Sequence, residues 1–108
     1  MPLRETVPTT ADGRPIVSAS SEYEQYEWLK AHLFELGMTP NDYRRWRNTS
    51  WRDTFRAWIS EHVVFVSSTN RPTIVKPGVV RMLQSSPELE KRMHAEIHKT
   101  PVLPLARW

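Results

Sequence analysis

Hydrophobic residues recur along the middle of this chain at intervals of three and four, which is the period of an α-helix. Ser21 and Glu24 have the spacing of a capping box, in which a hydroxyl and a carboxylate each accept a hydrogen bond from a free backbone N–H. Gly37 supplies a left-handed stop. We therefore predict a first helix from Ser21 to just before Gly37. Trp28 and Phe34 lie off its apolar stripe, so we expect it to be covered on more than one side. The stripe consists of Tyr26, Leu29, Leu33 and Leu36.

A second, short helix is predicted after Thr39. Pro40 suits the first helical position, and Asp42 stands three residues after the cap. Asn48 and Thr49 interrupt this helix. It carries Tyr43, Arg44, Arg45, Trp46 and Arg47.

A third helix is the best defined by the pattern. Ser50 and Asp53 repeat the capping spacing, and one wide apolar face follows them. We predict helix to about His62. The β-branched segment Val63–Val66 fits either a continuation of this helix or a short strand. The apolar face consists of Trp51, Phe55, Trp58, Ile59, His62, Val63 and Val66.

In the last third of the chain, the residue pattern predicts a polar loop over 67–72, an extended segment over 73–75 and a short helix over 77–84. A final helix opens at Ser86, and Glu88 and Arg92 stand on it at the favourable i, i+4 spacing. Its narrow apolar stripe is Leu89, Met93 and Ile97.

The two ends of the chain are polar or proline-containing and lack periodicity. We predict an extended N-terminal arm over 1–19, a helical domain over 20–99 and an extended C-terminal tail over 100–108. Trp108 on that tail is typical of an anchor that inserts into a pocket, or of a frayed end. The fold class is therefore mainly α, a small bundle of three to five short helices with extended arms. A body of this size obtains only about 3–5 kcal/mol from its core, so partners would help it.

Composition narrows the functional classes. The chain has 108 residues, a net charge of +3 and no cysteine, which excludes disulfides, thiolate metal sites and thiol nucleophiles. Residues 1–20 contain no apolar segment of a signal peptide, and Val63–Val66, the longest apolar run, is too short to span a bilayer. We expect an intracellular protein, cytoplasmic or organellar (for example mitochondrial) and not secreted. Peripheral attachment to a membrane stays open.

Catalytic and cofactor motifs are missing from the sequence. Its three glycines form neither a phosphate-binding loop nor a nucleophile elbow, and its carboxylates are scattered along polar helix faces. His94 and His98 stand four residues apart on the last helix, but a zinc site needs at least three protein ligands. We expect no catalytic residues, no metal and no cofactor.

The segment 33–46 supports the hypothesis that the chain binds nucleic acid. It has the pattern of a helix-turn-helix: a helix, a glycine turn and a capped basic helix. Three features weaken it. Leu33 stands where a small residue is usual, Tyr43 and Trp46 are bulky for inward positions, and the first helix carries four glutamates that would repel phosphates.

The remaining hypothesis is that the chain docks on another protein. Arginines alternate with aromatic residues from Tyr43 to Trp58, and this combination is enriched in interface hot spots. An ordinary domain with a tryptophan core and solvated arginines would show the same pattern. We assign the face with Trp51, Phe55 and Trp58 to the core and the short helix before it to contact. The prediction is a non-enzymatic structural or accessory subunit that docks on other protein subunits of a larger assembly; a helix-turn-helix-like nucleic-acid binder is the alternative. The expected partner-binding residues are Tyr43, Arg44, Arg45, Trp46, Arg47, Arg52, Arg56 and Trp108.

Overall fold

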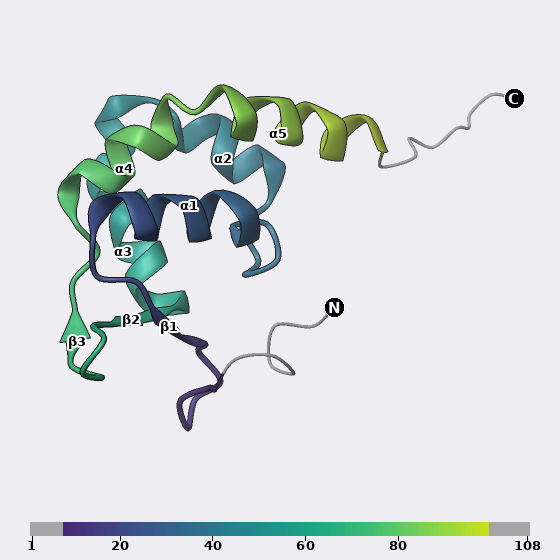
Figure 1. Ribbon diagram of the computed structural model, residues 1–108. Coiled ribbons are helices and arrows are strands. Elements are labelled where there is room, and N and C mark those ends of the chain that lie inside the picture. Colours follow the sequence, from purple (N-terminus) through teal and green to yellow (C-terminus); the bar gives the residue numbers. More distant parts are fainter. Residues whose placement is uncertain (1–7, 100–108) are drawn as a thin grey trace, which may run out of the picture.

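The helices gather at one end of the molecule and a small sheet lies at the other (Figure 1). The computed structural model describes residues 8–99. Within these residues five α-helices and one 3-10 turn confirm a mainly helical chain, and the three-stranded sheet is an addition that the sequence analysis left out. The elements in chain order are β1 (Ile16–Ser18), α1 (Glu22–His32), α2 (Pro40–Trp46), η2 (Thr49–Trp51), α3 (Arg52–His62), β2 (Val64–Val66), β3 (Pro72–Thr73), α4 (Pro77–Gln84) and α5 (Pro87–Lys99).

The sheet brings the strand before α1 next to the strand after α3. β1 pairs in parallel with β2, with Ile16 opposite Val64, and β3 pairs antiparallel to β2 on its other side. Val63 is already extended, so the β-branched segment that the sequence left open is a strand and not the end of α3. A polar turn with Asn70 at a φ of 63° connects β2 to β3.

The expected N-terminal arm is in part a structural element, which corrects its boundary. β1 lies within residues 1–19, and Val17 and Ala19 are buried in the core. This strand could not be predicted from the sequence, because two apolar residues show no periodicity and their partner strand lies more than forty residues further along the chain. Residues 1–7 and the predicted tail over 100–108 lie outside the described residues.

The helix starts read from the sequence are confirmed at α1 and α2. Ser21 Oγ accepts from the N–H of Glu24 at 3.1 Å, and the Glu24 carboxylate accepts from the N–H of Ser21 at 3.2 Å. The backbone N–H groups of Ser21 and Ser20 both donate to this carboxylate and hold the pKa of Glu24 below its usual value. Thr39 and Asp42 form the same box at α2. These local hydrogen bonds fix where each helix begins.

The predicted cap of the third helix is wrong. Asn48 Oδ1 accepts from the N–H of Ser50 at 2.9 Å and opens the 3-10 turn η2, and α3 begins only at Arg52. Trp51 consequently occupies the N-cap position of α3, which makes no side-chain capping bond. Its side chain is 38% exposed and does not belong to the buried face that includes Phe55.

Two buried glutamines connect the elements. Gln25 on α1 donates to the carbonyls of Ala19 and Ile74 and accepts from the N–H of Lys76. Gln84 on α4 donates to two carbonyls at the end of α2, including that of Trp46 at 2.9 Å. The hydrogen bonds satisfy backbone groups in segments that have no regular structure. The largest fully buried side chains around them include Tyr43, Phe55, Phe65, Leu29, Leu33, Met38 and Ile59.

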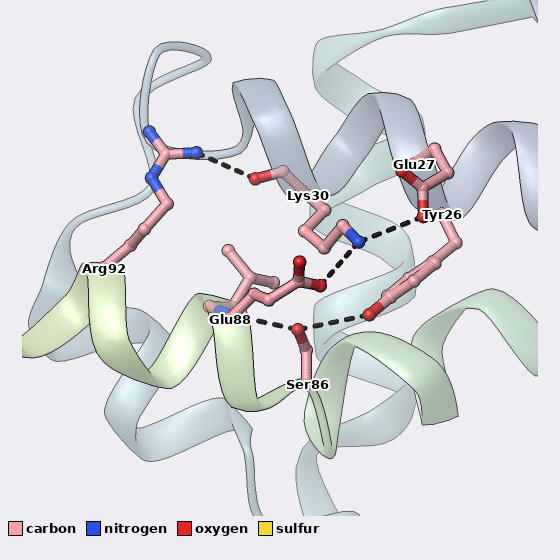
Figure 2. A network of polar contacts seen from close by, with 7 residues as sticks. Tyr26, Glu27, Lys30, Ser86, Glu88 and Arg92 are labelled. Carbon is pink, nitrogen blue, oxygen red and sulfur yellow. Dashed lines mark hydrogen bonds and ion pairs between the residues drawn. The ribbon is translucent and has the colours of Figure 1, made fainter.

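A polar network joins α1 to α5 (Figure 2). Lys30 Nζ lies 2.6 Å from a carboxylate oxygen of Glu88 and 3.0 Å from one of Glu27, and these hydrogen bonds raise the pKa of Lys30. Arg92 donates to the Lys30 carbonyl at 2.8 Å. The expected pairing of Glu88 with Arg92 along α5 is thus replaced by two contacts across the helix pair.

The same network includes the start of α5. Ser86 Oγ accepts from the N–H of Leu89 and from the hydroxyl of Tyr26, each at 3.2 Å (Figure 2). One buried hydroxyl therefore caps α5 and holds it against α1.

Candidate functional site

The short helix α2 divides its side chains between core and surface. Tyr43 is 0% exposed; its hydroxyl donates to the Leu83 carbonyl at 2.7 Å, and burial raises its pKa to about 12. Trp46 is 9% exposed, with its ring 6.0 Å from that of Phe55. Neither side chain is available to a partner in this structure, which corrects the expectation that both would make contact. They stand three residues apart and so share the inward face of the helix.

Arg47 is also used within the molecule. Its guanidinium lies 3.1 Å from the carboxylate of Glu90 on α5, and its buried Nε makes no hydrogen bond. Most of its charge is therefore already matched. Arg44 and Arg45, by contrast, are exposed on the surface of α2.

An arginine and a tryptophan meet on the surface where α2, η2 and α3 follow each other. The Arg45 guanidinium lies 6.0 Å from the centre of the Trp51 ring, within the range of a cation–π contact. The Arg–Trp patch, defined here as Arg44, Arg45 and Trp51, joins an exposed aromatic face to two exposed cations. The sequence analysis named both arginines but placed Trp51 in the core.

A cleft of about 340 Å³ between α3 and α4 begins beside this patch. Arg52, the residue after Trp51, lines it together with Arg56 and Arg81. None of the ion pairs among the described residues involves these three arginines. Three guanidinium groups therefore face one lining carboxylate, that of Asp53. We call this the arginine cleft.

The arginine cleft combines expected and unexpected residues. Arg52 and Arg56 were predicted as contact residues, and the Arg56 Nε is held by the Val75 carbonyl at 2.8 Å. Arg81 was missed. It lies on the polar side of α4, and nothing local to its sequence shows that this side faces α3. Trp108, the remaining predicted contact residue, lies outside the described residues.

The histidines have structural neighbours. His32 stacks on Trp28 and His62 stacks on Trp58, and each Nδ1 lies within 2.9 Å of the carbonyl four residues earlier. The rings of His94 and His98 are 6.5 Å apart. Within residues 8–99 no group of three or more metal-binding side chains comes together.

The helix-turn-helix segment does not have two helices packed mainly on each other. α1 packs chiefly on α4, and α2 chiefly on α5. The side chains of α2 that remain exposed are Asn41, Arg44 and Arg45. In the part of the chain that the structure describes, every helix is too short or too polar to cross a bilayer.

Comparison with known proteins gives no relative: no family model, no curated protein and no solved structure matches this chain. The Arg–Trp patch and the arginine cleft are therefore the features of the molecule from which a function can be inferred.

Proposed function

We propose that this chain is a non-enzymatic accessory subunit that docks on an acidic protein surface in a larger intracellular assembly, using the Arg–Trp patch and Arg52. The observation that supports this most is the contact of Arg45 with the partly exposed ring of Trp51. Beside it, Arg52 makes no ion pair among the described residues. Tryptophan and arginine are the residues most enriched in interface hot spots.

The patch suits docking because its parts are already held in place. The backbone of Trp51 lies at the junction of the 3-10 turn and α3, so both elements set the position of this residue before a partner binds. Arg45 is positioned over the ring and can pair with a carboxylate through both terminal nitrogens. A hot-spot tryptophan contributes about 2 kcal/mol or more, which is about 30-fold in affinity.

Nucleic acid is the second candidate, because exposed arginines beside a tryptophan would also suit phosphates and stacked bases. The two candidates differ in salt dependence. Neutralising several phosphates gives a steep fall of affinity with salt concentration, whereas a few pairs on a protein surface give a shallow one.

The test compares variants during purification from the native source under mild conditions. We expect Arg45→Glu with Trp51→Ala to reduce the amount of stoichiometric partner at least tenfold while the thermal unfolding temperature stays unchanged. Arg71→Glu with Tyr23→Ala is the matched control, because it alters an exposed arginine and an exposed aromatic residue away from the patch. Unchanged incorporation of the first variant would contradict the proposal. So would a monomer that binds duplex DNA with a steep salt slope.

The role proposed for Trp108 has a separate test. If the C-terminal tail is an anchor, removing residues 101–108 should weaken incorporation and leave the helical content unchanged. Equal incorporation of the shortened chain would refute the anchor and leave the Arg–Trp patch unaffected.

A further inference from the structure

The arginine cleft is lined by one side of each of two helices. Arg52 and Arg56 stand four residues apart on α3, and Pro77 and Arg81 stand four residues apart on α4. Residues at this spacing lie on the same side of a helix. Because α3 and α4 pack against each other, the three arginines line one space of about 340 Å³ from two connected helices.

The charge of this cleft is not matched by its own residues. Three arginines and Asp53 give the lining a net charge of +2. Neither the three guanidinium groups nor the Asp53 carboxylate takes part in an ion pair among the described residues. Arginine keeps its proton at any physiological pH, so the cleft cannot lower its charge by deprotonation. A bound anion with two negative charges would neutralise it.

Arg56 is the arginine of the cleft whose position is fixed best. Its side chain is half-buried, and its Nε donates to the Val75 carbonyl at 2.8 Å. This hydrogen bond uses one nitrogen and leaves the two terminal nitrogens to donate to a ligand. A guanidinium that is already held in place loses less freedom when an anion binds.

We propose that the arginine cleft binds one phosphate monoester, carried by a phosphorylated serine or threonine side chain of the partner protein. At neutral pH this group has a charge of about −1.5 to −2 and three strong acceptor oxygens. It therefore matches both the net charge of the cleft and its three guanidinium groups. A carboxylate has one charge and two oxygens, so a bidentate pair with one guanidinium would leave the other two unmatched. This proposal rests on the proposed docking function and specifies the group that the partner presents.

Two other sources of phosphate fit the molecule less well. Each phosphodiester of a nucleic acid carries one negative charge and two free oxygens, so a single link would leave the cleft positive. A free phosphate has the same chemistry as the monoester but makes no use of the neighbouring surface. Arg52 follows the exposed Trp51, so a protein segment that carries the phosphate can continue over the Arg–Trp patch.

The first test uses the full chain and three end-blocked peptides, Gly-Gly-X-Gly-Gly, in which X is phosphoserine, glutamate or serine. Binding is followed by NMR chemical-shift changes of the amides of Asp53, Arg56 and Arg81. We expect saturable shifts with the phosphoserine peptide, an affinity at least about tenfold weaker with the glutamate peptide, and no shifts with the serine peptide.

Variants assign this binding to the cleft. Arg52→Gln with Arg81→Gln should weaken phosphoserine binding at least about tenfold. Arg71→Gln with Lys91→Gln is the matched control, because it removes the same charge from exposed positions outside the cleft, and it should bind like the unaltered chain. Asp53→Asn should strengthen binding by about two- to fivefold, since it removes the one negative charge of the lining.

The second test treats the complex from the native source with a phosphatase, with the loss of phosphate from the partner verified by mass. We expect release of the partner. Four outcomes would overturn the proposal: equal binding of the glutamate and phosphoserine peptides, an equal loss of affinity in the control variant, a partner that carries no phosphate or stays bound without it, or binding of inorganic phosphate or an oligothymidylate at least about tenfold tighter than that of the phosphoserine peptide.

Failure of this proposal is distinguishable from failure of the docking proposal. Loss of partner in the variant of Arg45 and Trp51, together with no phosphoserine binding, would keep the Arg–Trp patch as the docking surface and discard the phosphate site. Phosphoserine binding with unchanged incorporation of that variant would keep the phosphate site and discard the Arg–Trp patch.

Discussion

The buried amide of Gln25 is the contact whose removal should most affect stability. It is 0% exposed and makes three hydrogen bonds of 3.0–3.1 Å: to the carbonyls of Ala19 and Ile74 and from the N–H of Lys76. The substitution Gln25→Met keeps the length and approximate volume of the side chain, so it creates no large cavity. It leaves one buried N–H and two carbonyls without their partner.

The magnitude follows from those three groups. An orphaned buried donor or acceptor costs about 1–3 kcal/mol, and partial access to water and the better packing of methionine offset some of this. We therefore expect a loss of about 2–4 kcal/mol in the free energy of unfolding. A body of this size has only about 3–5 kcal/mol, so the variant should lie close to its unfolding midpoint without denaturant.

Urea unfolding followed by circular dichroism measures this loss, with hydrogen exchange of the Lys76 amide as the local readout. Lys91→Met on the exposed side of α5 is the control, since it introduces the same residue where no buried bond is lost. A change below about 0.5 kcal/mol in Gln25→Met, or an unchanged exchange rate at Lys76, would refute the reasoning that this amide holds β1, β3 and α1 together.

Two further predictions concern buried residues near the termini and on α2. Val17→Ala should lower the free energy of unfolding by about 1.5–3 kcal/mol, because Val17 is buried in β1. The control Ser18→Ala should change it little. If urea unfolding showed equally small effects for both variants, the residues before α1 would not contribute to the stability of the fold. Burial raises the pKa of Tyr43 to about 12. The folded state therefore keeps a proton that the unfolded state loses above about pH 10. The free energy of unfolding should consequently fall by about 2–3 kcal/mol as the pH rises from 10 to 12. Tyr43→Phe should flatten that part of the stability–pH curve, and an equally steep fall in the variant would assign it to other groups.

In the proposed docking, the Arg–Trp patch and the arginine cleft would act together. Trp51 and Arg52 are consecutive, so the exposed tryptophan lies next to the first arginine of the cleft at the start of α3. A partner anion bound in the arginine cleft would thus leave the Arg–Trp patch free for a second contact. Two weak contacts on one rigid surface reinforce each other, because the first removes much of the translational freedom that the second would otherwise lose.

The sequence by itself determined the helices and most of their ends. The capping boxes at Ser21 and Thr39 and the proline that opens α4 depend on hydrogen bonds and backbone angles within a few residues, so they can be predicted from spacing alone. The predicted end of the first helix is wrong: α1 ends at His32, and turns lead from there to Gly37, which has a φ of 118°. The apolar stripes of the first and last helices identified Leu29, Leu33, Leu89 and Met93 as buried but missed Gln25.

Only the tertiary structure decided which aromatic residue faces outward and which cations meet. Trp51 lies outside the buried face because Asn48 starts a 3-10 turn and α3 begins only at Arg52. Trp46 is buried because it shares the inward face of α2 with Tyr43. The pairing of β1 with β2 and the meeting of Arg81 with Arg52 join residues distant in the chain. Contacts between residues distant in the chain depend on the sum of weak packing energies over the whole core. A local sequence pattern therefore cannot predict them.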